Sequence, residues 1–276
     1  MKKYFPVIII GILFIVLSSG LPVFAGKEKG AEKKEFPQKQ TVQIPNSVIT
    51  ITKENTYPNP AQNLPKLQPS ELTAELLKTS KEKIENPDLI KMLNETSVNS
   101  TPFAFGYRAV IYLGRWPLNY QSSETSPNWE YQKINTNFFD NRGGNANYQI
   151  HYVQEQQKVV RGGLTAKIPK AEQVKKMMLM AASEKTNLPL AFETIVGAGT
   201  KNDRIYNIPP KRLGYLYAYA PAVNEKGKVT YGEVYLMLKG SRKQLIVKNV
   251  TTQGIGAWIP IQDHVSFGFT AVEHPR

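Results

Sequence analysis

In the segment NFFDNRGGNANYQIHY, residues 137–152, the polar residues Asp140, Asn141, Asn145 and Asn147 surround the glycine pair Gly143-Gly144 and His151 follows, as in a cation-binding or phosphate-binding loop. A calcium loop of the EF-hand kind needs oxygen ligands at alternate positions, glycine at the sixth position and a closing glutamate. Counted from Asp140, the third position is Arg142, and glycine takes the fourth and fifth. A phosphate loop opens a helix, whereas a strand pattern follows here. We therefore predict a hairpin turn between two strands, with glycine and asparagine at positive φ.

The histidines are the other residues that could hold a metal. The chain has three histidines and no cysteine, which excludes disulfides and thiolate ligands. His151 and His264 each alternate with apolar residues, so both imidazoles are predicted to face outward unless both faces of the sheet are covered. No HxH or HExxH spacing occurs. We predict no metal site and no cofactor.

A nucleophilic site is suggested by QDHVSF, which contains Asp263, His264 and Ser266. In a strand, Asp263 lies on the face opposite His264 and Ser266, so it cannot orient the imidazole. No G-x-S-x-G motif is present. Paired carboxylates of the glycosidase type remain open; the candidates are Glu124, Glu130, Asp140, Glu155, Glu193, Asp203, Glu233 and Asp263. We favour a non-enzymatic function and keep a wall-polymer hydrolase or transferase as the alternative.

Tyrosines recur at strand spacing in two segments. Three of them share one face of LGYLYAYA, and Tyr231 and Tyr235 are predicted to share a face of VTYGEVYLMLK. Such rows can stack on sugars or peptides while basic neighbours hold anions, or they can simply pair across strands. The candidate ligand-binding residues are Tyr215, Tyr217, Tyr219, Lys211, Arg212, Arg242 and Lys243.

Strand patterns predominate among the elements that must position these side chains. From residue 105 onward ten strands are predicted, at 109–116, 128–139, 148–154, 158–168, 188–197, 213–220, 229–239, 244–250, 256–261 and 264–269. The segments NEKGK and KGSRK are predicted to be hairpin loops. PKAEQVKKMMLMAASEKT predicts a helix with a methionine-rich apolar stripe, and Ser70 and Asn86 are predicted to cap two short helices before the sheet. The fold class is therefore α+β: a largely antiparallel β-sheet domain with one long amphipathic helix and two short N-terminal helices.

The N-terminal region predicts export. Lys2 and Lys3 precede an apolar run at residues 7–17, and Val23-Phe24-Ala25 fits a processing site; a retained anchor is the alternative. We predict a signal peptide at 1–25, a flexible charged leader at 26–46, and a Pro-rich strap with two short helices at 47–104 that packs on the main domain. A β-rich domain follows at 105–271, with a tail at 272–276.

Charge points to the partner class. The chain has 35 Lys and Arg against 22 Asp and Glu, a net charge of +13. From Phe105 onward the counts are 22 basic and 12 acidic residues. Such an excess attracts anionic surfaces in a salt-sensitive manner, although it can also serve solubility alone. Export without cysteine favours a Gram-positive bacterium. We therefore expect anionic cell-wall polymers or lipid headgroups as partners, no nucleic acid and no disulfide-linked partner.

Several segments of the sequence are similar to those of a known family. KENTYPNPAQNLPKLQPSELT, ENPDLIKMLNE, GYRAVIYLGRWPLNY, KINTNFFDNRGGN, YAPAVNEKGKVTYGEVYL and QGIGAWIPIQDHVSF resemble the YfkD-like family of Bacillus and its relatives, over residues 47–269. The resemblance implies an exported protein of endospore-forming Gram-positive bacteria and carries over no catalytic or binding position. We expect a cell-envelope binding protein that is extracellular or associated with the wall or membrane surface; an accessory role in sporulation or envelope stress is a further alternative.

Overall fold

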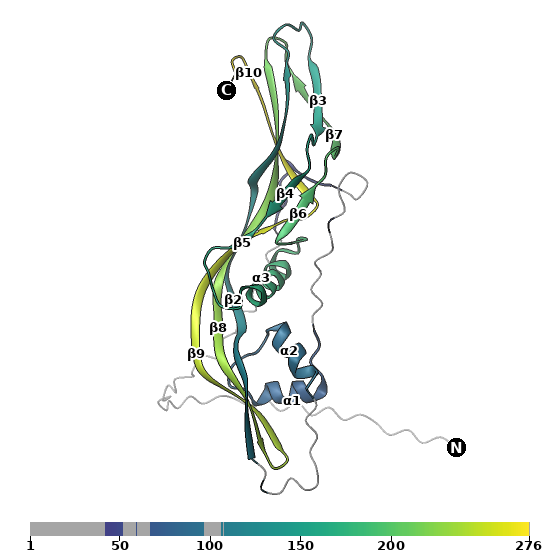
Figure 1. Cartoon of the computed structure of the whole chain (residues 1–276). Coiled ribbons are helices and arrows are strands. Elements are labelled where there is room, and N and C mark those ends of the chain that lie inside the picture. The colour runs from purple at the N-terminus through teal and green to yellow at the C-terminus, as the bar shows by residue number, and fades with distance from the viewer. Residues whose placement is uncertain (1–41, 52–58, 60–66, 97–105, 107, 276) are drawn as a thin grey trace, which may run out of the picture. The chain divides into compact units, whose positions relative to one another are not determined.

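The computed structural model describes residues 42–51, 59, 67–96, 106 and 108–275 (Figure 1). The predicted signal peptide and most of the predicted leader lie outside these residues, as do three parts of the predicted strap, 52–58, 60–66 and 97–104. The described elements are β1 (Val48–Thr50), α1 (Glu71–Thr79), α2 (Pro87–Asn94), β2 (Arg108–Asp140), β3 (Tyr148–Val153), β4 (Lys158–Arg161), β5 (Gly163–Leu164), α3 (Ala171–Thr186), β6 (Glu193–Val196), β7 (Lys201–Ile208), β8 (Leu213–Lys239), β9 (Arg242–Pro260) and β10 (His264–Val272).

Strand β8 organises the main sheet. One edge of β8 pairs with β2 along its whole length, and β2 accommodates this with five register shifts. The other edge pairs first with β10 and then with β9. β1 extends the sheet beyond β10, and β5 extends it beyond β9. The pairs β3–β7 and β4–β6 form two small sheets. Every pairing is antiparallel, which confirms the predicted mostly antiparallel α+β class.

The two N-terminal helices begin where their capping residues place them. The Ser70 hydroxyl accepts from the Thr73 N–H at 3.2 Å, and the Asn86 side chain accepts from the Asp88 N–H at 3.0 Å. Pro87, which lacks an N–H, occupies the first helical position, where no intrahelical partner exists for one. Both predicted caps are confirmed.

The third helix differs from its prediction. α3 spans 16 residues, so the described fold has three short helices and does not show a single long amphipathic one. The predicted apolar stripe consists of Ala171, Val174, Met177, Met178, Ala181 and Ala182, whereas the buried residues of α3 also include Leu179 and Thr186. The buried face is broad because α3 contacts both α2 and the strands β2 and β8.

Three apolar clusters follow one another along β8, on the side where Figure 1 shows the helices. Residues with even numbers are buried from Leu216 to Ala222, odd-numbered ones from Val223 to Tyr231, and even-numbered ones again from Val234. Each change of parity exchanges the two faces of the strand. Tyr231 is consequently buried while Tyr235 is half-buried on the other face, so the prediction that they share a face is wrong.

Two predicted turns have different outcomes. KGSRK forms the turn between β8 and β9, with Gly240 at φ 56°. NEKGK lies inside β8, so its prediction as a loop is wrong. The segment after Asp140 does connect two strands, yet it is no hairpin, because β2 pairs with β8 and β3 with β7. Neither Gly143 nor Gly144 has positive φ.

Candidate functional site

The tyrosine row, which comprises Tyr215, Tyr217 and Tyr219 on β8, is the strongest of the predicted features. All three side chains are half-buried on one face, while the alternating Leu216 and Ala218 are buried on the other. The rings of Tyr215 and Tyr217 stand parallel, with centroids 6.0 Å apart, and Tyr217 and Tyr219 are 6.4 Å apart. Because the rings pack against one another, their hydroxyl edges are the groups available to a ligand.

None of these three hydroxyls forms a hydrogen bond with another residue in the described part of the chain. Gly268 of β10 lies opposite Tyr217, so the central ring has no side chain beside it on that edge. The pKa of Tyr219 is raised by burial and by the nearby Glu130 carboxylate, so this phenol stays protonated and can donate. The row therefore presents three phenol hydroxyls that have no hydrogen-bond partner among the described residues.

Strand β2 supplies the opposite border of the row. The exposed Phe138 packs on Tyr215 with ring centroids 4.9 Å apart, and the Lys133 Nζ atom lies 5.4 Å from the Tyr217 ring centroid. Neither residue was predicted for the site, because the β2–β8 register cannot be read from one strand alone. Their spacing of five residues also crosses a register shift between Lys133 and Asn135.

The predicted basic residues divide into two groups. Lys211 and Arg212 precede Tyr215, and the Arg212 guanidinium pairs with the Glu273 carboxylate at 2.9 Å. Arg242 and Lys243 begin β9, beyond the other end of β8. At about 3.3 Å per residue, the 27 residues of β8 separate the two groups by a contour of about 90 Å. One small ligand cannot contact both groups.

The asparagine- and glycine-rich turn after β2 is held by its own side chains. The Asp140 carboxylate accepts from the Arg142 backbone N–H at 2.9 Å and from its guanidinium at 2.8 Å. This bonding to Arg142 holds the pKa of Asp140 below its ordinary value. The buried Asn141 amide donates to three backbone carbonyls, those of Ala146, Ile208 and Pro209. The turn is built as structure, with Arg142 at its exposed tip.

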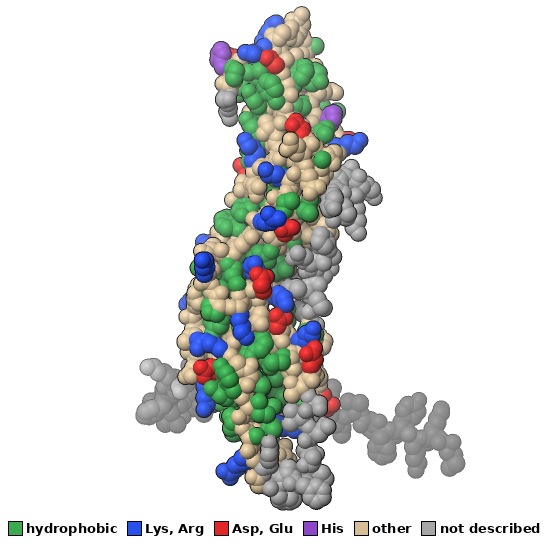
Figure 2. All heavy atoms as spheres, in the orientation of Figure 1, with side chains coloured by type: hydrophobic (Ala, Val, Ile, Leu, Met, Phe, Trp, Pro, Cys, Tyr) green, Lys and Arg blue, Asp and Glu red, His purple; other side chains and the backbone are tan. Residues whose placement is uncertain are grey.

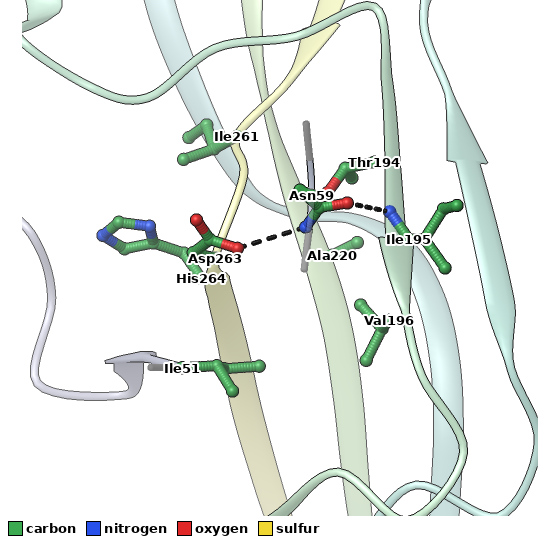
Figure 3. A pocket seen from close by; sticks show the side chains of 9 residues that line it. All are labelled: Ile51, Asn59, Thr194, Ile195, Val196, Ala220, Ile261, Asp263 and His264. Atoms are coloured by element: carbon green, nitrogen blue, oxygen red, sulfur yellow. Dashed lines mark hydrogen bonds between the residues drawn. The ribbon is translucent and has the colours of Figure 1, made fainter. Parts of the chain in front are cut away.

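The residues of QDHVSF do not assemble a catalytic set (Figure 3). His264 Nδ1 lies 2.7 Å from the Gln262 carbonyl, so this nitrogen carries the proton. The Asp263 carboxylate instead accepts from the Asn59 side chain at 3.1 Å, and Asn59 in turn accepts from the Ile195 N–H. The adjoining cavity has about 10 Å³, which is room for one water at most.

The orientations of the two strand histidines differ. His151 is exposed, as predicted, whereas His264 is only 9% exposed and its predicted outward orientation is wrong. The start of β10 is buried on both faces, since Val265 and Ser266 are buried as well, and β1 pairs along it. Within the described ranges, no three His, Asp or Glu side chains gather as a metal ion would require.

A buried polar network lies where NEKGK was predicted to form a loop. Glu225 is 0% exposed, and its carboxylate accepts from the Tyr120 hydroxyl at 2.8 Å and from the Thr125 hydroxyl at 2.6 Å. The network continues through Ser122 to Lys185, whose Nζ donates to the Ser122 hydroxyl at 2.7 Å. Burial and the Glu225 carboxylate raise the pKa of Tyr120 far above its ordinary value. The network ties the end of α3 to β2 and β8.

A cleft of about 490 Å³ opens between the helices and β2, lined mostly by apolar side chains such as Leu77, Ile90 and Met177. Small-molecule sites have this size, but they also present a few convergent polar groups. Of the four polar residues in its lining, the Tyr120 hydroxyl is directed to Glu225 and Glu85 pairs with Lys83 at 2.6 Å, and Gln68 and Glu184 are the other two. Among the described helices, none has the length and apolar content needed to cross a membrane.

Comparison with known proteins gives a family match and a close relative. The model of the YfkD-like protein family matches residues 45–276. The chain is 60% identical to the Uncharacterized protein YfkD of Bacillus subtilis (strain 168), over 276 residues that cover all of both chains. No solved structure matches the chain.

Proposed function

Since the chain belongs to the YfkD-like family, we propose that it is an exported, non-catalytic binding module of the cell envelope. Its ligand is an anionic, hydroxyl-rich wall polymer that lies along the tyrosine row. The observation that carries this proposal is the row of three half-buried tyrosines whose solvent-accessible hydroxyls have no hydrogen-bond partner among the described residues. These hydroxyls remain accessible to water, so an external partner with many hydroxyl or phosphate oxygens can take the place of that water.

The direction of the row supports a polymer over a small molecule. Tyr215, Tyr217 and Tyr219 succeed one another along β8, and their centroids are separated by 6.0 and 6.4 Å. A linear ligand can therefore make the same contact repeatedly. Lys133 beside Tyr217 and Lys211 at the end of the row offer positive charge to a polyanion.

The cellular location is proposed from independent features. Lys2 and Lys3, the apolar run and Ala25 have the order of a signal peptide. The absence of cysteine and the 60% identical Bacillus relative support the extracellular face of a Gram-positive cell. A protein in that location meets anionic wall polymers before any nucleic acid.

Sedimentation with purified Bacillus cell walls tests the binding proposal. Tyr217→Phe removes one hydroxyl and keeps the ring, so we expect affinity to fall about fivefold, the value of one ordinary hydrogen bond. Tyr148→Phe is the matched control, because Tyr148 is 43% exposed and stacks on Phe139 away from the row. Walls stripped of their anionic polymers should bind poorly. Equal binding by wild type and Tyr217→Phe would contradict the assignment, and release of soluble wall fragments would favour the hydrolase alternative.

A further inference from the structure

The far end of the main sheet carries a second surface, the basic–apolar face, defined by Arg108, Val110, Tyr112, Met237, Lys239 and Arg242. The strand register places these residues together. Arg108 pairs with Lys239, Val110 with Met237, and Lys239 with Arg242. Cross-strand partners share a face of the sheet, as do residues two apart on one strand.

The apolar residues of this face are exposed to an unusual degree. Val110 is 63% exposed and Tyr112 is 55% exposed. The opposite face is covered only in part, because Leu236 and Leu245 are buried in a cluster with residues of α1 and α2 while Ile111, the cross-strand partner of Leu236, is 44% exposed. Figure 2 shows hydrophobic side chains gathered over the lower ends of β2 and β8, with Lys and Arg beside them at the tip.

The strand ends that form this face carry charge of one sign. Residues 108–114 and 235–248 contain five Lys and Arg and no Asp or Glu. The neighbouring Glu233 carboxylate accepts from the Tyr235 hydroxyl at 2.9 Å and from the Asn249 side chain at 2.8 Å. At the tyrosine row acidic groups accompany the basic ones, since Glu130 lies near Tyr219 and Glu273 pairs with Arg212. The cations of these strand ends therefore lie beside exposed apolar side chains.

The combination of cations with exposed apolar side chains favours a bilayer over a water-soluble polyanion as the partner of this face. A polymer in water would satisfy the cations but would leave Val110 and Met237 solvated. At a membrane surface the apolar groups enter the headgroup–acyl boundary, tyrosine suits the same depth, and Lys and Arg contact anionic headgroups. We propose that the basic–apolar face docks this protein on an anionic lipid bilayer.

The docking surface is independent of the tyrosine row, because the length of β8 separates them. Lipid binding can therefore succeed or fail whatever the result with cell walls. The two tests also use different variants, so failure of either proposal is recognised separately.

Vesicle sedimentation tests the proposal, with vesicles of equal parts phosphatidylglycerol and phosphatidylcholine against pure phosphatidylcholine. The protein used is the chain without residues 1–25, so that the apolar run at 7–17 makes no contribution; the compact unit that begins at Lys39 remains whole. We expect salt-sensitive binding to the anionic vesicles and little binding to the neutral ones.

Two double variants separate charge from apolar insertion. Arg108→Gln with Arg242→Gln should weaken binding about twentyfold, at about fivefold for each charge removed, and should flatten the salt dependence. Val110→Thr with Tyr112→Thr keeps β-branched residues in the strand and should weaken binding roughly tenfold at every salt concentration.

Matched controls lie elsewhere on the surface. Lys158→Gln with Lys201→Gln removes the same charge, and Ile205→Thr changes an apolar side chain that is 55% exposed on β7. These variants should bind as the wild type does. The proposal is overturned if anionic vesicles fail to bind, or if the charge variant loses binding while the apolar variant keeps it. Circular dichroism verifies folding, and Val110→Thr alone replaces the double variant if that one unfolds.

Discussion

The hydrogen bond from Tyr120 to Glu225 allows a quantitative test of the buried network, through the substitution Tyr120→Phe. The Tyr120 side chain is 7% exposed, and its hydroxyl donates to a carboxylate that is 0% exposed. Phenylalanine preserves the ring, so packing changes little, while Glu225 loses one of its two hydroxyl donors. A hydrogen bond to a charged group contributes about 1.5–3 kcal/mol. We expect the free energy of unfolding to fall by about 2 kcal/mol.

Urea unfolding followed by circular dichroism measures this loss. With a slope of about 2–3 kcal/mol per molar urea, the midpoint should decrease by about 0.7–1 M while the slope stays constant. Tyr148→Phe is the control, because its side chain is 43% exposed, and changes at exposed positions stay within about 0.5 kcal/mol.

A double-mutant cycle with Thr125→Val tests whether the two donors act on the same carboxylate. The Thr125 hydroxyl donates to the second Glu225 oxygen at 2.6 Å. Residues that share a partner are coupled, so the two losses should not add. A loss below about 0.5 kcal/mol for Tyr120→Phe, or full additivity in the cycle, would refute the network as the source of stability.

Two further predictions concern pH and the turn after β2. Burial raises the folded-state pKa of Tyr120 and Tyr152 above the unfolded value of about 10. Their contribution to the free energy of unfolding is therefore complete below pH 10. It is lost as the pH rises further, by up to about 1.4 kcal/mol per pH unit for each phenol. Tyr120→Phe should reduce this dependence of the free energy of unfolding on pH when it is measured between pH 9 and 11. Asn141→Asp keeps the shape of a 6% exposed side chain but removes the amide that donates to three carbonyls. We therefore expect the free energy of unfolding in urea to fall by about 2–3 kcal/mol. An unchanged urea midpoint would contradict this account of the turn.

The sequence allowed the element types to be predicted wherever a local cause determines them. Ser70, Asn86 and Pro87 start helices because each satisfies, or does not require, the orphan backbone groups of a helix end. The turn at Gly240 was predictable because a glycine with charged neighbours separates two apolar patterns. Strand β7 was missed because its exposed side chains outnumber its buried ones, and its one fully buried residue is Ile208.

NEKGK shows how tertiary pairing overrides a local turn pattern. Lys226 and Lys228 are exposed, as in a loop, but Gly227 lies so close to β2 that a Cβ there would approach the Gln121 carbonyl oxygen to 2.3 Å. Pairing with β2 on one edge and β9 on the other supplies every backbone partner that a loop would find in water. Glu225 can then be buried because two hydroxyls reach it from β2.

The same continuity explains why the predicted site had to be divided. If β8 were two strands joined by a hairpin at NEKGK, the chain would reverse its direction there. Tyr217 would then face Tyr235 across a short sheet, with Arg242 nearby. A single 27-residue strand instead carries Tyr217 and Arg242 apart. The parity changes after Ala222 and after Tyr231 then decide which side chains meet solvent at each end. The sequence could therefore predict the tyrosines and the basic residues as candidates. Only the strand pairing could show that the candidates belong to two surfaces, one with phenol hydroxyls and one with cations around apolar groups.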